Sequence, residues 1–370
     1  MKFSCSRELL DRHLQYVSRI ITIRSSLPVL SNILLETDKD ILRITATDLE
    51  LAMTTHIPAT IEQEGTFTVP AKIFQEFVHQ NPDDTLTFSL ESFEMVGKSN
   101  KVTGRIAGID AEEFPDLPKL EKGSKVRLPL TPLVEALKQV VIACAQDQSR
   151  PVLTGVYMNL SEETAVLAAT DSFRLVERRI PIVPIQDSFT FLVPMRTIQE
   201  LIRISASFVE FPDLEVEITD QQLLMRLDTL EIYSRLLTGN FPKYHAIIPQ
   251  KFMAVAEVTT TELVQALRLS AIFSQSGVAN VMVEIDSEGT FTIASYGSQR
   301  GSTSHTVYAV MQEGFEPVRA AFNAKFLLDA CTASNSPHLE LRFSGPTTAL
   351  VIGTEDPTYL QLVMPIRLDS

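Results

Sequence analysis

The sequence has no tryptophan, only three cysteines and only 14 glycines among its 370 residues. Cys5, Cys144 and Cys331 lie far apart and none belongs to a Cys-x-x-Cys pair, so a disulfide framework or a zinc site is disfavoured and buried thiols are expected. Positive charge is also scarce. The net charge of -14 argues against a protein whose whole surface attracts nucleic acid, although it leaves room for a local basic surface.

Motifs for nucleotide or catalytic chemistry are missing as well. No phosphate-binding loop and no Gly-x-Gly-x-x-Gly stretch follows a strand pattern, and the six histidines lack the spacing of metal ligands or a catalytic triad. Asp48, Asp171 and His245 are polar groups near turns, but they form no usable constellation, and Thr-Asp pairs at strand ends are typical of hydrogen-bonded turns. We therefore expect a protein that is not an enzyme and that needs no metal or cofactor.

The composition favours a folded chain with several cores. Hydrophobic residues make up 45% and charged residues 21%, which excludes disordered and low-complexity classes. A single core rarely organises more than about 250 to 300 residues, so more than one domain is expected. No apolar run approaches the roughly 18 residues of a membrane span, and Arg7, Glu8 and Asp11 stand where a secretory signal needs an apolar stretch, so no membrane association and a cytoplasmic location are expected.

Short phrases return along the chain at a spacing near one third of its length. An alternating segment that ends in Thr47-Asp48 returns with Thr170-Asp171 at its end, and residues 291–296 form a weaker third copy. A second phrase has the pattern of a strand that turns into a helix, with proline at the helix start in two copies. Its three copies are Thr66 to Lys72, Thr190 to Arg196 and Ala320 to Lys325.

Each copy also opens with an amphipathic helical stripe, and strand-like alternation follows it. The stripes consist of Leu10, Leu14 and Val17, then Leu133, Leu137 and Val140, then Leu263, Leu267 and Ala271. The sequence therefore predicts an α+β fold of three repeated domains, each with two helices packed on antiparallel sheets. The expected domains are residues 1–122, 123–249 and 250–370.

The repeats predict how such domains assemble. Sheet edges must be covered or paired, so neighbouring copies are expected to pair edge to edge in an arc that a head-to-tail dimer closes. Each strand-to-helix phrase ends in a cation, at Lys72, Arg196 and Lys325. A basic surface formed by helices on an acidic protein is what a ring around DNA requires. Ordinary solvated helix faces are the alternative interpretation.

Taken together, the phrases resemble the bacterial DNA polymerase III beta subunit family, the replicative sliding clamps, from end to end. The residues that carry the resemblance are Met1-Lys2-Phe3, Leu27 to Leu35, Thr47 to Glu50, Val69 to Lys72, Glu113-Phe114-Pro115, Ala169 to Asp171 with Arg174-Leu175, Gly239 to Tyr244, and Met364 to Leu368. The resemblance implies the DNA clamp fold, a head-to-tail homodimer that forms a closed ring, and a hole through which duplex DNA passes without sequence-specific contacts. It also implies a processivity factor whose partners are the replicative polymerase, the clamp loader and other proteins with clamp-binding motifs.

The resemblance also implies site residues. Those expected to contact DNA, together with the three cations of the repeat, are Arg24, Lys72, Gln146, Arg150, Arg196 and Lys325. The pair of aromatics that the family has near Arg150 is replaced by Pro151 and Val152. The implied ring interface uses Ile106 of one chain against Ile272 and Phe273 of the other, and Phe273 is expected to fill the space left by Gly104, where an aromatic is common.

A groove that binds short peptides of partner proteins is the third implied site. Its residues are Leu153, Thr170, Phe173, Arg174, Leu175, Pro242, Ala246, Ile247, Leu362, Met364, Pro365, Ile366, Arg367 and Leu368. Adaptable Met364 is expected to shape the groove, and Arg174 or Thr170 to anchor the peptide. Phe173 replaces a common histidine, Ala246 replaces a common arginine, and Asp369-Ser370 extends the usual end of the chain. Core residues that join the second and third domains are the alternative interpretation.

One further function class remains open. A protein-binding scaffold could have the same repeats without DNA in its hole. Retention on circular but not on linear DNA would distinguish the two.

Overall fold

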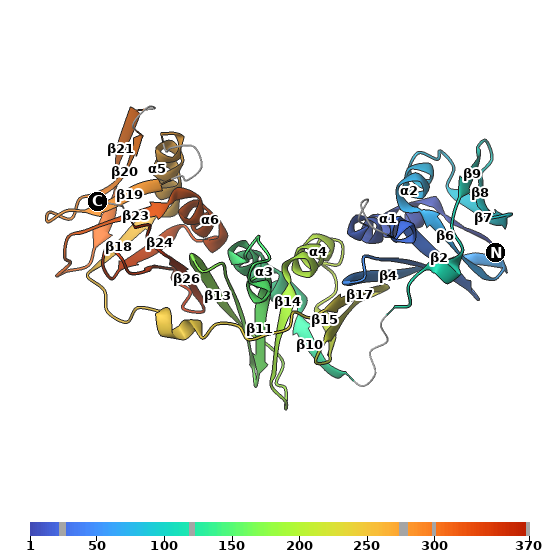
Figure 1. Ribbon diagram of the computed structural model, residues 1–370, viewed down its shortest axis with the longest axis horizontal. Coiled ribbons are helices and arrows are strands. Elements are labelled where there is room, and N and C mark those ends of the chain that lie inside the picture. Colours follow the sequence, from blue (N-terminus) through green and yellow to red (C-terminus); the bar gives the residue numbers. More distant parts are fainter. Residues whose placement is uncertain (22–26, 118–122, 274–279, 298–300, 368–370) are drawn as a thin grey trace. The chain divides into compact units, whose positions relative to one another are not determined.

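The computed structural model describes residues 1–21, 27–117, 123–273, 280–297 and 301–367 (Figure 1). Arg24 and Leu368, two of the expected site residues, lie outside these ranges. The chain forms two compact units, Met1–Thr131 with Arg203–Leu236, and Pro132–Ile202 with Leu237–Ser370. Each unit is described by itself below.

The first unit contains two antiparallel sheets and the helices α1 (Arg7–Val17) and α2 (Ala71–His79). The five-stranded sheet has the order β5 (Thr60–Gln63), β1 (Lys2–Ser6), β7 (Thr85–Glu91), β8 (Glu94–Lys98), β9 (Thr103–Ala107). The eight-stranded sheet has the order β10 (Ser124–Pro129), β15 (Asp213–Ile218), β16 (Gln222–Leu227), β17 (Leu230–Arg235), β4 (Leu51–Pro58), β3 (Ile41–Thr47), β2 (Asn32–Asp38), β6 (Gly65–Pro70).

The second unit contains two more antiparallel sheets and the helices α5 (Thr260–Ile272) and α6 (Ala324–Ser334). The nine-stranded sheet has the order β14 (Phe189–Pro194), β11 (Gly155–Ser161), β12 (Thr164–Thr170), β13 (Arg174–Pro181), β26 (Tyr359–Val363), β25 (Leu350–Gly353), β24 (His338–Phe343), β18 (Ala254–Thr259), β22 (Ala309–Met311). The four-stranded sheet has the order β21 (Gly301–Val307), β20 (Phe291–Gly297), β19 (Asn280–Ile285), β23 (Val318–Asn323). Helices α3 (Leu130–Val140) and α4 (Met195–Ser205) contain two of the boundaries between the units, and the third lies after β17 at Leu236.

The sheet orders confirm three repeated α+β domains. The order β6-β2-β3-β4 of the first domain recurs as β14-β11-β12-β13 in the second and as β23-β19-β20-β21 in the third. The order β1-β7-β8-β9 likewise recurs as β10-β15-β16-β17 and β18-β24-β25-β26. Each larger sheet therefore joins a strand set of one domain to a strand set of the next, through the pairs β4–β17 and β13–β26.

The Thr-Asp phrases form the same turn twice. The Thr47 hydroxyl donates to the Leu51 carbonyl (3.1 Å) and accepts the N–H of Leu49 (3.0 Å), while Asp48 Oδ1 accepts the N–H of Leu51 (2.8 Å). Equivalent bonds link Thr170 to Arg174 (2.6 Å) and Ser172 (3.1 Å), and Asp171 to Arg174 (2.9 Å). Leu49 and Ser172 also share a left-handed backbone, with φ of 78° and 77°. The two aspartates thus hold turns, as the sequence predicts.

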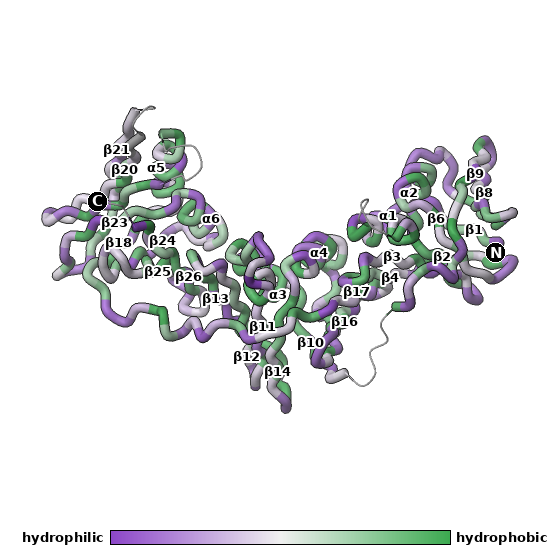
Figure 2. The backbone as a smooth tube through the Cα atoms, viewed as in Figure 1, coloured by the Kyte–Doolittle hydropathy of each residue, from purple (hydrophilic) through white to green (hydrophobic). Residues whose placement is uncertain are grey.

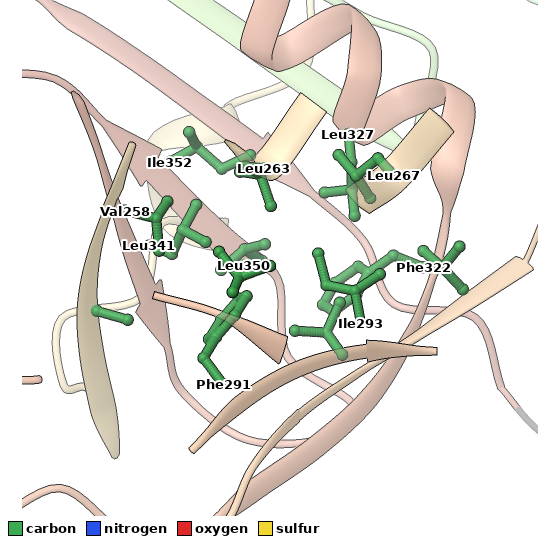
Figure 3. Packing of buried hydrophobic residues seen from close by; sticks show 14 of the residues in the cluster. Val258, Leu263, Leu267, Phe291, Ile293, Phe322, Leu327, Leu341, Leu350 and Ile352 are labelled. Carbon is green, nitrogen blue, oxygen red and sulfur yellow. The ribbon is translucent and has the colours of Figure 1, made fainter. Parts of the chain in front are cut away.

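Each domain buries the apolar side of its alternating strands and amphipathic helices. In the third domain, Leu263 and Leu267 of α5 and Leu327 of α6 pack on Phe291 and Ile293 of β20 (Figure 3). Hydrophilic and hydrophobic residues mix along helices such as α2 because only one face packs inward (Figure 2). All three cysteines are buried, as expected, and burial raises the pKa of each thiol to about 12.

A half-buried histidine connects α1 to β4. His13 Nδ1 lies 2.6 Å from Thr55 Oγ1, and the ring packs edge-on against Tyr16 with 5.3 Å between ring centroids. Burial, helped by the charges of Arg12 and His56, lowers the pKa of His13 from 6.5 to about 4. Because the unfolded chain then binds the proton more readily than the folded chain, stability is lost as the pH falls from 6.5 towards 4.

His13→Asn, which keeps a polar atom near Thr55, should reduce this loss. Between pH 7.5 and pH 5 we expect the wild type to lose about 1 kcal/mol more unfolding free energy than this variant. This value is smaller than for a fully buried ring, because the ring is partly exposed. Urea unfolding at both pH values measures the difference. The exposed His338→Asn is the control and should behave as wild type. An equal pH dependence of His13→Asn and wild type would contradict the assignment.

Candidate functional site

An apolar surface in the second unit combines the Thr170 turn, the connector after β17 and the end of β26. Phe173 and Ile247 are 62% and 54% exposed, and Pro242 and Ala246 are also exposed. Met364, Pro365 and Ile366 are half-buried, and Arg367 is exposed. Backbone bonds position this segment: Met364 N–H donates to Phe173 O (2.8 Å), and Ile366 N–H donates to Ala321 O (2.7 Å). We call the surface formed by Phe173, Pro242, Ala246, Ile247 and residues 364–367, where the family resemblance implies a peptide groove, the apolar groove.

Arg174 supports the groove from beneath. Its guanidinium donates to Asp171 Oδ2 (3.0 Å) and Asp329 Oδ2 (2.6 Å) and lies 4.5 Å from the centroid of the Phe326 ring. Only 10% of its side chain is exposed. The Thr170 hydroxyl is likewise engaged within its own turn. Both groups therefore shape the groove, with their hydrogen bonds directed at the protein itself.

Three expected groove residues contribute no surface. Leu153, Leu175 and Leu362 are 3%, 1% and 1% exposed, so they belong to the core beneath the groove. This placement matches the alternative interpretation for these three positions.

The connector that carries Pro242 and Ile247 is fixed by groups that the sequence analysis missed. The Tyr244 hydroxyl donates to Glu177 Oε2 (2.5 Å), and Arg179 Nε donates to Glu177 Oε1 (2.8 Å). Phe241, in turn, stacks on Tyr157 with 4.9 Å between centroids. Burial and the bond to Glu177 raise the pKa of Tyr244 well above its usual value. The available signal in the sequence was a glutamate two residues after Leu175, on the same face of strand β13. The structure buries this residue, since Glu177 is only 4% exposed.

Tyr244→Phe removes one of the bonds to this buried carboxylate. We expect a loss of about 1 to 3 kcal/mol in unfolding free energy, since Glu177 keeps Arg179 but loses a short hydrogen bond. Urea unfolding provides the measurement. Tyr157→Phe is the matched control and should stay within about 0.5 kcal/mol of wild type, because the Tyr157 hydroxyl accepts only a 3.4 Å bond from Asn159. Similar losses in both variants would show that the Glu177 contact has no special weight.

The three cations of the repeat occupy equivalent places. Lys72, Arg196 and Lys325 are each the second residue of a helix, α2, α4 and α6, and all three are exposed. A cation in the first turn opposes the positive end of the helix dipole, so the dipole does not account for this recurrence. A binding role for these three cations remains a prediction.

The other polar residues expected near DNA are in the loop after α3. Gln146 and Arg150 are exposed; Gln146 Nε2 lies 3.7 Å from Met195 Sδ, and Arg150 Nη1 donates to Ser172 Oγ (3.2 Å). Arg150 therefore lies beside the Thr170 turn that also presents Phe173.

Two strands at the two ends of the repeat series are sheet edges. Strand β9 ends the five-stranded sheet and β21 ends the four-stranded sheet. Ile272, the last residue of α5, is 65% exposed, and Phe273 is half-buried. Ile106 is only 5% exposed, so its side chain already packs within its own domain.

The space at Gly104 is filled from within the first domain. Gly104 pairs with Gly97 across β8 and β9, and a Cβ atom at either position would lie 2.5 Å from the Phe77 ring. The two glycines therefore leave room for Phe77, which covers both. The expectation that Phe273 of another chain fills this space is wrong, because Phe77 occupies it.

Two other kinds of feature are absent from the described residues. No helix among them is long and apolar enough to cross a membrane. Within the same ranges, no three side chains of His, Cys, Asp or Glu are grouped as a metal ion would require.

Known structures with this fold are sliding clamps. A DNA polymerase sliding clamp from Bacillus subtilis matches over 100% of both chains with a TM-score of 0.95 and 26% identity. The beta subunit of DNA polymerase III from Thermotoga maritima matches over 100% of both chains with a TM-score of 0.92 and 26% identity. The fold of three repeated domains is therefore the DNA clamp fold.

Sequence comparisons give the family. Models of the N-terminal, central and C-terminal domains of the DNA polymerase III beta subunit match residues 1–118, 127–243 and 245–367. A beta sliding clamp of Synechocystis is 31% identical over 100% of both chains. The chain belongs to the DNA polymerase III beta subunit family, as its sequence predicts.

Proposed function

We propose that the protein is a DNA polymerase processivity factor, a non-catalytic ring that encircles duplex DNA and tethers partner proteins through the apolar groove. Relatives of this chain are named beta sliding clamps, which supports this role. The observation that carries the proposal is the pattern of strand pairing between domains. A cytoplasmic location and the domain limits 1–122, 123–249 and 250–370 remain predictions.

The pairing pattern implies a second copy. Strand β4 of the first domain pairs with β17 of the second, and β13 of the second pairs with β26 of the third. The repeat makes β4, β13 and β21 equivalent strands of the three domains. It likewise makes β9, β17 and β26 equivalent. One chain leaves these two strands as edges. An antiparallel pair between β21 of one chain and β9 of another would continue the series head to tail.

A homodimer should be held by this edge pair and by Ile272 and Phe273 beside it. Native mass spectrometry should give twice the 41.2 kDa of the chain. Replacing Ile272 and Phe273 together with Ala removes apolar contact area worth about 3 kcal/mol at each of the two interfaces of the ring, so the dimer should weaken roughly ten-thousandfold and monomers should appear. Tyr308→Ala with Val310→Ala, which removes two other exposed apolar side chains of the third domain, should leave the dimer intact. A dimer that survives the first pair of changes would place the interface elsewhere.

Sequence-independent DNA binding would come from cations that face the hole. Lys72, Arg196 and Lys325 are the best candidates because they recur at equivalent, exposed helix positions. Gln146 and Arg150, and Arg24 outside the described ranges, are further candidates. Contacts limited to phosphates would let the ring slide, since base contacts would fix its position.

Charge reversal separates binding from folding at these positions. The triple change Lys72→Glu, Arg196→Glu and Lys325→Glu should weaken DNA binding in fluorescence anisotropy and reduce its salt dependence. Thermal stability should hold or rise, because a carboxylate in the first helical turn contributes about 0.3 to 1 kcal/mol. Changing Lys98, Lys243 and Lys251 to Glu alters the net charge equally and is the control. Equal weakening by both triple variants would show that only net charge matters.

The apolar groove would bind short segments of the replicative polymerase, the clamp loader and other proteins with clamp-binding motifs. Exposed Phe173 and Ile247, with half-buried Met364 and Pro365, offer the apolar contacts such a peptide needs. Arg174 and Thr170 would act by holding the turn that presents Phe173.

Phe173→Ala combined with Ile247→Ala should weaken a glutamine- and leucine-containing clamp-binding peptide by at least about tenfold, the effect of losing more than 1 kcal/mol at a hot spot. Fluorescence polarisation provides the affinity. Val183→Ala with Val209→Ala removes two apolar side chains that are just as exposed and should have no effect. Unchanged affinity in the Phe173 and Ile247 variant would show that the peptide site lies elsewhere.

A further inference from the structure

The first unit contains a cavity of about 620 Å³ that belongs to none of the sites above. It lies between the segment that follows β9 and the eight-stranded sheet. Leu34 of β2 and Leu224 and Tyr233 of the β16–β17 pair line it from the sheet, and Phe114 and Leu117 line it from the segment. Leu34 and Leu117 are half-buried, so apolar surface remains open to a ligand.

The equivalent place in the second unit is filled by the chain itself. There the connector lays Phe241 on Tyr157 of β11, and Tyr244 packs against Val351 and Leu362 of the β25–β26 pair. Phe114-Pro115 repeats Phe241-Pro242, and the strand orders β2-β3-β4-β17-β16 and β11-β12-β13-β26-β25 are equivalent. The two connectors therefore cross corresponding parts of two corresponding sheets.

Two residues account for the difference between the two places. Leu117 stands two residues after Pro115, where Tyr244 stands two residues after Pro242. Thr54, the fourth residue of β4, corresponds to Glu177 of β13 and bonds to Thr45 (3.0 Å). The first unit thus lacks both the tyrosine ring and the carboxylate that binds its hydroxyl. Its cavity lies where the aromatic side chain of Tyr244 lies in the second unit.

The charges around the cavity favour a cation. Arg226 in the floor is already paired with Glu217 (2.9 Å) and Glu231 (3.0 Å), so its charge is more than balanced. Tyr233 also donates to Glu231 (2.7 Å). Glu36, Glu112 and Asp116 add three carboxylates to the described lining, and Arg43 is its other cation. The lining therefore carries a surplus of negative charge beside an apolar slot.

We propose that this cavity is a docking site for an aromatic side chain carried by a positively charged peptide segment of a partner protein. The ring would take the place that Tyr244 takes in the second unit, against Leu34 and Leu224. A neighbouring lysine or arginine would face the carboxylates of Glu112 and Asp116. This site is distinct from the apolar groove and would let a partner bind both compact units of the chain.

The peptide acetyl-Lys-Tyr-His-amide, which copies residues 243–245, is the direct probe. In methyl NMR of the full chain with labelled leucine, we expect it to shift the signals of Leu34, Leu117 and Leu224, with a dissociation constant on the order of 1 mM for a ligand of this size. Acetyl-Lys-Ala-His-amide should leave these signals unchanged. Shifts confined to other leucines, or equal shifts with the alanine peptide, would overturn the proposal.

Two variants test shape and charge separately. Leu117→Phe should fill the slot and weaken binding of the tyrosine peptide by about tenfold. Glu112→Gln with Asp116→Asn keeps the slot. It should weaken binding of the tyrosine peptide about threefold and reduce the salt dependence of that binding. Glu288→Gln with Glu313→Gln removes two exposed carboxylates elsewhere and should leave the affinity as in wild type. Wild-type affinity in both the Leu117 and the Glu112–Asp116 variants would also overturn the proposal.

Discussion

The requirement that strand edges find partners governs this molecule. Backbone N–H and C=O groups at an unpaired edge are a template for further pairing. Within the chain, β4–β17 and β13–β26 satisfy this requirement at the two domain junctions. The same rule applied to β21 and β9 is the basis of the proposed head-to-tail assembly. The proposed ring closure and DNA encirclement both depend on that one step.

The two junctions use the same sheet order but differ in what covers them. At the second junction, a tyrosine bound to buried Glu177 fixes the connector, which presents Pro242 and Ile247 at the groove. At the first junction, Leu117 leaves a cavity with an acidic lining. A repeated scaffold thus carries two different surfaces, because the covering segments differ while the strand pairing is the same.

Local patterns in the sequence were enough to predict the repeated domains, the Thr-Asp turns and the equivalent cations. Each of these depends on residues within one turn or one strand-to-helix phrase. The missed features depend on residues far apart in the chain. Phe77 covers Gly104 from another element, Arg174 is paired with Asp329, and Tyr244 meets Glu177 across 67 positions. Periodicity does not encode such contacts, so the burial of Ile106 and Arg174 could not be predicted from it.

The most direct test of the ring is whether DNA topology controls binding. The protein would be loaded onto nicked circular DNA by a clamp loader, separated from free protein at a salt concentration that screens phosphate contacts, and then treated with an enzyme that cuts the circle once. A ring predicts that the protein stays on the intact circle and is released when the DNA is linearised. Equal retention on circular and linear DNA, or loss from both, would contradict the account.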